Sequence, residues 1–237
     1  MTQRDNTGST KSAQLLARQI HREIIQLGWP VGENLGSEPE LLQRYGAGRG
    51  VFREAIRLLE SWQVAGMRAG RNGGLFVLRP DDLAVTHAAS VFLGYASVDP
   101  GQLLAARLAI EPVCVQMAMQ RLVEDDLDRL RDTLKVEHEA YGAGSHEGTH
   151  GLHVVIADMS GNPAMALFAR VLTRLTLEET EFRDIDDPKA GRSARRAHEG
   201  IVEAMLTGDA ALAQHRMRRH LEALLRYIES RPPREHE

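Results

Sequence analysis

The chain has 237 residues, of which 43% are hydrophobic and 26% are charged, and this composition excludes a disordered or fibrous protein. The length predicts one to two domains that can bury a core without a disulfide or a structural metal. The single cysteine, Cys114, excludes an intrachain disulfide and fits a reducing cytosol. There is no bilayer-length apolar run and no apolar stretch in the first residues, so we expect a cytoplasmic protein with no membrane segment.

The net charge of −4 argues, as a total, against nucleic-acid binding, but the charge is unevenly distributed. Residues 1–80 carry 11 Lys and Arg against 7 Asp and Glu, whereas the remaining residues carry 18 against 26. Such a split favours two domains with different partners, the basic one facing phosphate. Small domains also differ by a few charges by chance, so the split alone is weak evidence.

A boundary between the two parts is visible in the local pattern. Residues 75–78 form a short apolar run typical of a strand, and the turn-forming sequence of residues 79–82 follows it directly. We therefore expect a flexible tail, a first domain, a linker, a second domain and a second flexible tail at residues 1–11, 12–78, 79–84, 85–230 and 231–237.

The first domain shows the order of a helix-turn-helix. Apolar residues at helical spacing predict a helix over residues 13–27. Ser37-Glu38-Pro39-Glu40 is a capping box, in which the serine and the second glutamate satisfy each other's backbone amides, and it predicts a short helix ending at Tyr45. Gly46-Ala47-Gly48 then predicts a tight turn before a second helix over residues 49–62.

The second of these helices carries the chemistry expected of a DNA reader. Arg49, Arg53 and Arg57 follow each other at intervals of four residues and so share one face, while apolar side chains occupy the opposite face. Guanidinium groups on such a face can bind phosphates and guanine edges in a major groove. A solvated basic face of an ordinary amphipathic helix is the alternative, but the preceding capped helix and turn favour DNA reading.

Residues 68–74 contain two arginines and three glycines and precede the apolar run at 75–78. This pattern predicts a hairpin tip in which Arg71 and the glycines, Gly73 among them, approach the sugar-phosphate backbone closely. Together with the two helices, the hairpin predicts a winged helix-turn-helix.

Three segments resemble the GntR family of bacterial transcription regulators, whose members bind pseudo-palindromic operators as dimers. They are Gly32-x-x-Leu35-x-Ser37-Glu38-x-Glu40-Leu41, Arg49-x-x-x-Arg53-Glu54-Ala55-Ile56-x-x-Leu59-Glu60, and residues 70–77. The resemblance implies double-stranded DNA as a partner, a homodimer, base and phosphate contacts from Arg49 and Arg53, and Gly73 at the wing tip. Pro39 and Gly48 depart from the family pattern, which usually has Arg and Ser or Thr at these positions. Gly48 is nevertheless predicted to contact DNA, together with Arg49, Arg53, Arg57, Arg71 and Gly73.

The second domain shows only helical periodicity. Asp99-Pro100 predicts the start of a helix that runs to about residue 122, and on it Arg107 and Glu111 interrupt an apolar stripe. A buried arginine is costly unless it is paired or holds an anion, so Arg107 is a candidate carboxylate ligand with Glu111 as its partner. A purely structural ion pair is about equally consistent with the spacing.

Three histidines, His153, His198 and His220, point inward from separate predicted helices, whereas His215 falls on a solvent-facing side. Neutral imidazole is a good ligand for Zn, Ni or Fe, so three converging rings could hold one divalent metal. A single inward histidine is more often a satisfied core residue, and this alternative stays open for each of them.

The histidine segments resemble the FCD ligand-binding domain of the FadR subfamily of GntR regulators. The matching segments are His153 with Ser160-Gly161-Asn162-Pro163, His198-x-x-Ile201-x-x-Ala204-Met205-x-x-Gly208-Asp209, and Arg218-Arg219-His220-Leu221. The resemblance implies an all-helical antiparallel bundle that holds a divalent metal through one Asp and three His and binds a small carboxylate effector. It assigns the histidines to the metal and Arg107, with Glu111 and Asn162, to the effector.

The expected aspartate is missing, because Thr149 stands four residues before His153. Three imidazoles still suffice for Zn²⁺ when water or an effector oxygen completes the shell, and His146 or His150 could substitute for the aspartate. We therefore keep Thr149 in the predicted metal site beside the three histidines.

The sequence thus predicts a mainly α protein, with an N-terminal winged helix-turn-helix and a C-terminal all-α bundle, that acts as a metabolite-responsive regulator and not as an enzyme. A metal-dependent hydrolase built on the three histidines is an alternative, but the adjacent Glu199 diverges from His198 around the helix and is poorly placed as a base. A DNA-binding scaffold whose bundle only dimerises is a further alternative.

Overall fold

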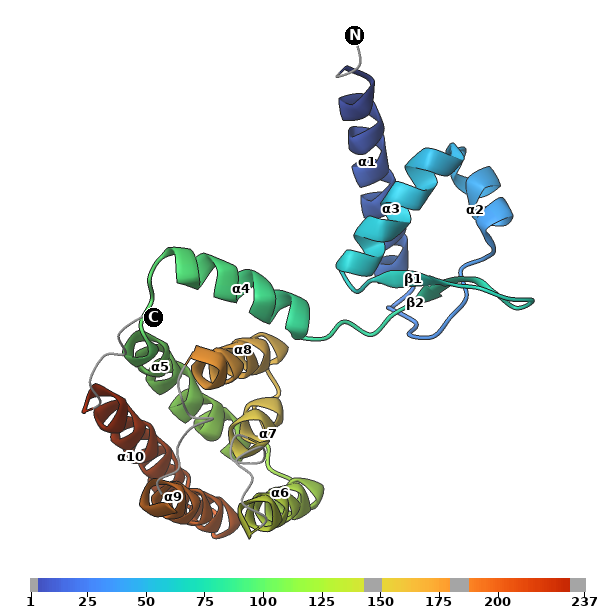
Figure 1. The fold of residues 1–237 in the computed structure, drawn as a ribbon. Coiled ribbons are helices and arrows are strands. Elements are labelled where there is room, and N and C mark those ends of the chain that lie inside the picture. Colours follow the sequence, from blue (N-terminus) through green and yellow to red (C-terminus); the bar gives the residue numbers. More distant parts are fainter. Residues whose placement is uncertain (1–3, 143–150, 180–187, 231–237) are drawn as a thin grey trace. The chain divides into compact units, whose positions relative to one another are not determined.

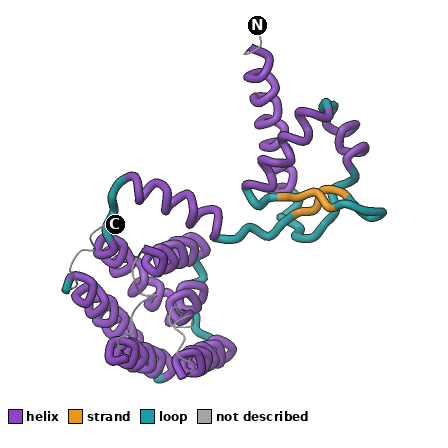
Figure 2. Tube along the Cα trace, in the orientation of Figure 1, coloured by secondary structure: helices purple, strands orange, loops and turns teal. Residues whose placement is uncertain are grey.

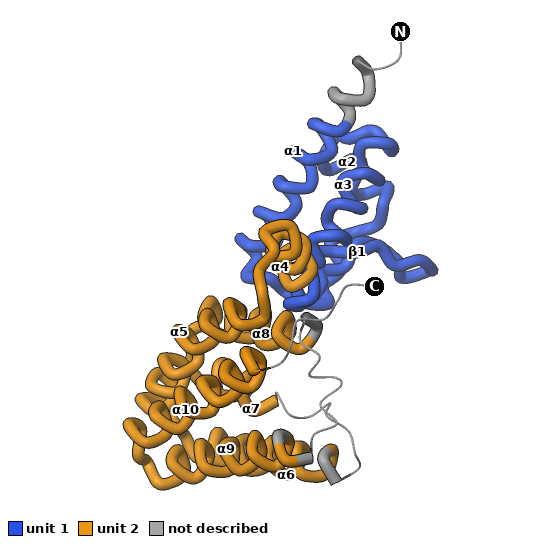
Figure 3. Tube along the Cα trace, turned by 60° about the vertical axis from the view of Figure 1, so that its left-hand side comes forward, with its two compact units in different colours: residues 1–84 blue, residues 85–237 orange. Residues whose placement is uncertain are grey.

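The computed structural model describes residues 4–142, 151–179 and 188–230. They form two compact units that divide between Ala84 and Val85 (Figure 3). Helices dominate both units, and the two strands belong to the N-terminal unit (Figure 2). The mainly α fold class predicted from the sequence is confirmed.

The N-terminal unit contains three helices and a two-stranded antiparallel hairpin (Figure 1). These elements are α1 (Arg4–Gln26), α2 (Glu38–Tyr45), α3 (Arg49–Ser61), β1 (Ala65–Arg68) and β2 (Gly74–Val77). Ala65 pairs with Val77 at the base of the hairpin and Arg68 with Gly74 at its tip, so the connecting loop projects as a wing. The order of the elements is that of a winged helix-turn-helix, as predicted.

Local chemistry explains why α2 and α3 form where they do. The backbone amide of Ser37 donates to Glu40 at 2.8 Å, which completes the capping box at the start of α2. Gly46 ends α2 in the left-handed conformation, with φ of 61°, which a glycine adopts without a steric penalty. α3 then buries one face made of Phe52, Ala55, Ile56 and Leu59. The opposite face is left to solvent, and this division gives α3 its reading face.

The first helix differs from the sequence prediction. α1 begins at Arg4 and not at Ala13, so residues 4–11, which were expected to be a flexible tail, are helical. Ala13, Ile20 and Ile24 are fully buried in the core of the unit and anchor the helix. Extending an anchored helix adds one hydrogen bond per residue without a new nucleation cost, which accounts for the extra turns.

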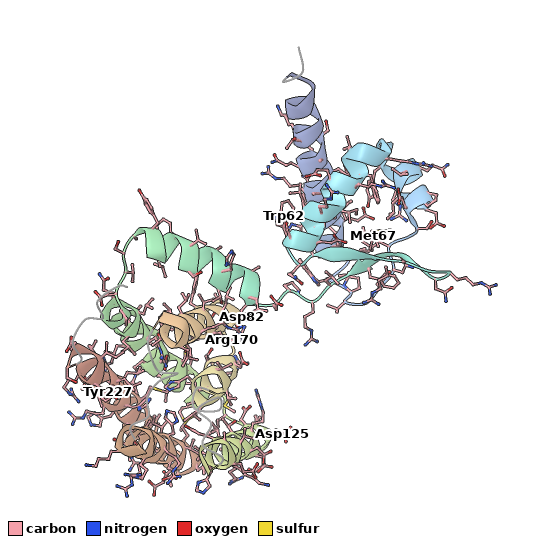
Figure 4. The ribbon with its side chains drawn as sticks, in the orientation of Figure 1. Trp62, Met67, Asp82, Asp125, Arg170 and Tyr227 are labelled. Carbon is pink, nitrogen blue, oxygen red and sulfur yellow. The ribbon has the colours of Figure 1, made fainter. Side chains whose placement is uncertain are left out.

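The C-terminal unit is a bundle of seven described helices. They are α4 (Leu83–Tyr95), α5 (Pro100–Met119), α6 (Glu124–Gly142), α7 (Gly151–Met159), α8 (Pro163–Glu179), α9 (Pro188–Leu206) and α10 (Ala210–Glu229). Asp99 caps α5 and Asp209 caps α10, each with its side chain accepting from a backbone amide of the first turn. α5 packs against α7, α8 and α10, and α9 packs against α6 and α10, so side chains of these helices fill one shared interior (Figure 4).

Two boundaries in this unit differ slightly from expectation. α4 begins at Leu83, inside the predicted linker of residues 79–84, and α5 ends at Met119 instead of about residue 122.

Cys114 is buried and free, and burial raises the pKa of its thiol to about 11. Within the described residues, no helix combines the length and the apolar composition needed to cross a bilayer.

Candidate functional site

The reading face of α3, defined here as Arg49, Arg53 and Arg57, is open to solvent. The side chains of Arg53 and Arg57 are 71% and 76% exposed, and Arg49 is also exposed. Their ion pairs are exposed, at 3.9 Å from Arg53 Nε to Glu38 and 3.2 Å from Arg57 Nη1 to Glu54. Exposed pairs of this kind contribute about 0–1 kcal/mol, so the guanidinium groups can exchange these partners for phosphates or base edges.

Gly48 is the N-cap of α3, with φ of −70° and ψ of 149°, and it makes no side-chain hydrogen bond to the helix. A Cβ at this position would meet nothing within 4 Å. The first backbone amides of α3 therefore remain available, and helix N-termini of this kind bind phosphate well.

The wing presents basic side chains on a backbone that needs glycine. Arg71 is exposed at the tip, and the guanidinium of Arg68 lies 4.3 Å from the centre of the Phe76 ring, a cation–π contact that holds it on the hairpin. A Cβ on Gly73 would overlap the carbonyl oxygens of Arg68 and Gly70, so the tight tip excludes other residues. The six residues predicted to contact DNA thus belong to one unit, on α3, at its cap and on the wing.

The three histidines predicted as metal ligands meet in the C-terminal bundle. His153 on α7, His198 on α9 and His220 on α10 are all buried, and one ligand nitrogen from each lies within 4.8 Å of the other two. The Nε2 atoms of His198 and His220 are 3.1 Å apart. Nitrogens bound to one tetrahedral Zn²⁺ stand about 3.3 Å apart, so this spacing fits a shared metal.

Two buried carboxylates lie directly behind the histidine cluster. Oε2 of Glu111 lies 2.5 Å from Nδ1 of His153, and Oε1 of Glu137 lies 2.6 Å from Nδ1 of His198. An ionised carboxylate only accepts, so the proton of each ring sits on Nδ1 and the lone pair on Nε2. Metal-binding histidines are oriented by carboxylates in this way. The donor set therefore fits a divalent metal held by three imidazole nitrogens.

Arg107 lies beside this cluster through Glu111. Its Nε donates to Oε1 of Glu111 at 2.5 Å, and both side chains are almost completely buried, at 0% and 2% exposed. Neither Nη1 nor Nη2 of Arg107 has a hydrogen-bond partner in the described part of the chain. The ion pair to Glu111 thus satisfies only part of the guanidinium and leaves the planar end that binds carboxylates bidentately.

Charge states in the cluster favour metal binding. Burial works to raise the pKa of Glu111, but Arg107 and His153 outweigh it and lower this pKa to about 2. Burial also lowers the pKa of His153, against the opposing charge of Glu111. The structure therefore has an ionised Glu111 beside a neutral His153, and neutral imidazole is the form that binds a metal.

The remaining predicted site residues are placed differently. Oδ1 of Asn162 accepts from the backbone amides of Ala164 and Met165, so this side chain caps α8. These hydrogen bonds give Asn162 a structural role, and its effector contact stays a prediction. Thr149, like its proposed substitutes His146 and His150, lies outside the described residues.

Sequence reasoning missed Glu137. A signal was present, because Glu137 continues the row of Leu127, Leu130 and Leu134 at intervals of three and four residues along α6. An acidic residue on the apolar row of a helix is expected to be buried and to need a partner. The partner, His198, could be identified only from the folded chain.

Comparison with known proteins identifies matches over both units. Residues 13–77 match "Bacterial regulatory proteins, gntR family", and residues 102–223 match "FCD domain". The second match covers more than half of the chain. The two matched segments contain the reading face of α3 and the histidine cluster, respectively.

Curated relatives match along most of their length. LutR, an HTH-type transcriptional regulator of Bacillus subtilis, is 28% identical over 80% of this chain and 89% of its own. NanR, an HTH-type transcriptional repressor of Cronobacter sakazakii, is 23% identical over 90% of this chain and 84% of its own. Both are described as regulators, and the hydrolase interpretation of the histidine cluster has no support from them.

The fold is also that of a solved protein. A structure titled "Streptococcus agalactiae GntR" superimposes with a TM-score of 0.71 and covers 91% of this chain and 99% of its own. At 22% sequence identity, this likeness supports the fold alone.

Proposed function

The chain belongs to the GntR family of bacterial regulatory proteins and carries an FCD domain, so it is a transcription regulator, and on this premise we propose that it represses transcription until a small carboxylate binds in its C-terminal bundle. Repression is supported by the NanR relative, which is a transcriptional repressor. The observation that carries the effector proposal is the buried guanidinium of Arg107, whose two terminal nitrogens have no hydrogen-bond partner among the described residues.

The DNA-binding part of the proposal rests on the reading face of α3. Three exposed arginines at four-residue spacing suit a helix placed in the major groove of double-stranded DNA, with the wing and Arg71 reaching the neighbouring backbone. The location that follows for the protein is the cytoplasm, because that is where bacterial DNA lies.

The effector part rests on an energetic argument. A buried guanidinium whose donors are unsatisfied costs several kcal/mol, because water can no longer bind it. A carboxylate that accepts two parallel hydrogen bonds from Nη1 and Nη2 would offset this cost. Glu111 cannot do so, since it already lies against Nε and against His153. The site therefore suits a second, incoming carboxylate, and the effector class we propose is a small organic acid.

The metal part rests on the fit of the donor set. His153, His198 and His220 would hold a divalent cation such as Zn²⁺, Ni²⁺ or Fe²⁺ through their Nε2 atoms. Such a cation supplies a Lewis-acid position for a carboxylate oxygen. Arg107 would bind the same acid through Nη1 and Nη2. Glu111 would fix the guanidinium and the His153 ring relative to each other, because it contacts both.

The proposed homodimer is supported by the outer face of α4. Val91, Phe92 and Tyr95 on this helix are 61%, 67% and 89% exposed, and α4 contains no Asp, Glu, Lys or Arg. On the other side of α4, Ala89 and Leu93 pack against a cluster formed by Leu103 of α5 and by Val171 and Leu175 of α8, and Figure 4 shows side chains of α4 extending away from the bundle. Residues near a two-fold axis face their own copies, so an uncharged apolar face suits a second copy of this chain.

Analytical ultracentrifugation of variants of the α4 face tests the proposed dimer. The double variant Phe92→Ser and Tyr95→Ser is expected to sediment as a monomer at concentrations where the wild type is dimeric. Val136→Ser on α6 is the matched control, because Val136 is 59% exposed but stands outside this face. An unchanged dimer in the double variant contradicts the α4 interface.

The effector proposal is tested by operator binding. DNA fragments selected from the genome by the full-length protein are titrated, by fluorescence anisotropy, with a panel of small mono- and dicarboxylates, with added Zn²⁺ and with a chelator. We expect one class of acid to weaken operator binding in the Zn²⁺ series. Arg107→Gln should bind the operator but lose this response, whereas Arg131→Gln on the exposed side of α6 should keep it. A protein that binds DNA equally with every acid is instead the scaffold whose bundle only dimerises.

A further inference from the structure

Glu137 differs from the other buried charged groups around the histidine cluster in having no cation as its partner among the described residues. It lies on α6, is 1% exposed, and places Oε1 2.6 Å from Nδ1 of His198. Its other oxygen, Oε2, has no hydrogen-bond partner among the described residues. The second carboxylate of the cluster, Glu111, differs because it contacts the cation Arg107. Glu137 therefore brings a negative charge into the bundle interior, with only an imidazole against it in the described chain.

A buried carboxylate of this kind is expensive to keep unless something in the site uses its charge. Removing a carboxylate from water costs several kcal/mol, and a single hydrogen bond from an imidazole returns only part of this. A glutamine or an apolar residue would fill the same space without the charge. The stabilising partner is therefore expected close to His198, on the far side of its ring, where Nε2 lies 3.1 Å from Nε2 of His220.

We propose that Glu137 is a positioning residue for the metal centre, which holds the Nδ1–H tautomer of His198 and supplies outer negative charge for a divalent cation at Nε2. The proposal rests on the metal site put forward above. In the sequence, Thr149 stands at the position where the family resemblance implies an aspartate. Three neutral imidazoles bring no charge to the cation. Glu137 would supply one negative charge from behind the ring of His198, without binding the cation itself.

The first test measures metal affinity. Zn²⁺ binding to the full-length protein is measured by competition with a chelating dye. Glu137→Gln keeps the shape of the side chain and removes its charge, and we expect Zn²⁺ to bind about 10–100-fold more weakly. Glu139→Gln removes an equal charge from an exposed position of the same helix and should leave the affinity unchanged.

The second test reads the ring of His198 directly and needs no metal. In the metal-free wild-type protein, ¹⁵N NMR of labelled histidine should show a protonated Nδ1 and a bare Nε2 for His198. Glu137→Leu removes the acceptor, so this signal should move toward the mixture of tautomers seen for an unconstrained imidazole. A role limited to packing would not move it. Thermal unfolding of each variant verifies that the bundle remains folded.

The outcomes separate this proposal from the one on which it rests. Zn²⁺ binding by the wild type with equal affinity in Glu137→Gln overturns the role of Glu137 and leaves the metal site standing. If the wild type binds no Zn²⁺, the metal site itself fails, and the tautomer measurement alone decides whether Glu137 orients His198. An unchanged tautomer in Glu137→Leu overturns the proposal in either case.

Discussion

On α3 the side chain of Arg53 is 71% exposed and lies 3.9 Å from Glu38, whereas on α5 Arg107 is fully buried and lies 2.5 Å from Glu111. The first arginine keeps most of its hydration and gives it up only when a partner arrives. The second has lost its water already, when the chain folded. Both can bind an oxyanion, but the cost of dehydration falls at a different moment in each unit.

This difference sets how the two units should respond to ligands. An exposed arginine face recognises DNA through many weak, salt-sensitive contacts, none of which holds the fold together. A buried arginine is part of the fold, so a ligand that binds it changes the stability of the bundle as well as its occupancy. Substitutions should therefore separate cleanly into those that affect DNA binding and those that affect stability.

The largest effect is expected at Arg107. Arg107→Ala leaves Glu111 buried beside His153 without its cation, and we expect the free energy of unfolding to fall by about 3–5 kcal/mol. Urea denaturation of the full-length protein measures this loss. Arg53→Ala should change the same quantity by no more than about 0.5 kcal/mol. Equal effects of the two substitutions would remove the distinction between the units.

Metal addition should give the next largest change. Zn²⁺ at a free concentration 100 times its Kd is expected to raise the free energy of unfolding by about 2.7 kcal/mol, because the unfolded chain has no assembled site. His198→Ala should abolish this increase and reduce bound metal well below one ion per chain. His215→Ala, on the exposed side of α10, is the matched control. Full metal occupancy in His198→Ala would contradict its assignment as a ligand.

On the DNA side, Arg49→Ala should reduce specific operator binding by about 1–3 kcal/mol without affecting stability. Arg57→Ala removes a predicted phosphate contact. It should therefore reduce the number of counterions released on binding by about one, which makes the operator affinity less sensitive to salt. Anisotropy titrations at several salt concentrations measure both quantities. Unchanged operator affinity in Arg49→Ala would mean that α3 does not read the operator.

The smallest effect is expected at the cap of α3. Gly48→Ser places a hydroxyl where it can accept from the first amides of the helix, and its backbone angles suit a serine. We expect a gain of a few tenths of a kcal/mol in the free energy of unfolding. Gly46→Ser should have the opposite sign, with a loss of about 1 kcal/mol, because φ there is 61°. A loss at both positions would show that Gly48 is needed for its conformation.

The sequence was most informative where the determining contacts are local. The capping box of Ser37 and Glu40 lies within four residues, and Gly46 sets the turn by its own φ, so α2 and α3 could be predicted with their ends. The i, i+4 spacing of Arg107 and Glu111 likewise predicted a pair that the structure contains. The inward direction of the three histidines followed from the apolar rows of their own helices.

What could not be predicted depends on distant parts of the chain. Glu137 and His198 are 61 positions apart, so the place of Glu137 on the apolar row of α6 indicated burial, but its partner could be identified only from the packing of α6 against α9. Asn162 shows a different limit. The structure adds that its side chain caps the next helix, while its predicted contact with an effector stays a prediction.

Glu111 contacts Arg107 with one oxygen and His153 with the other. If the acid binds at Arg107 and the cation at His153, the two ligands share this carboxylate, and their binding free energies are coupled. Linkage requires the coupling to be reciprocal. The factor by which the bound cation raises the affinity for the acid therefore equals the factor by which the bound acid raises the affinity for the cation. A cell poor in the metal would then need more of the acid to release the same operator, and the regulator would respond to both ligands through a single side chain.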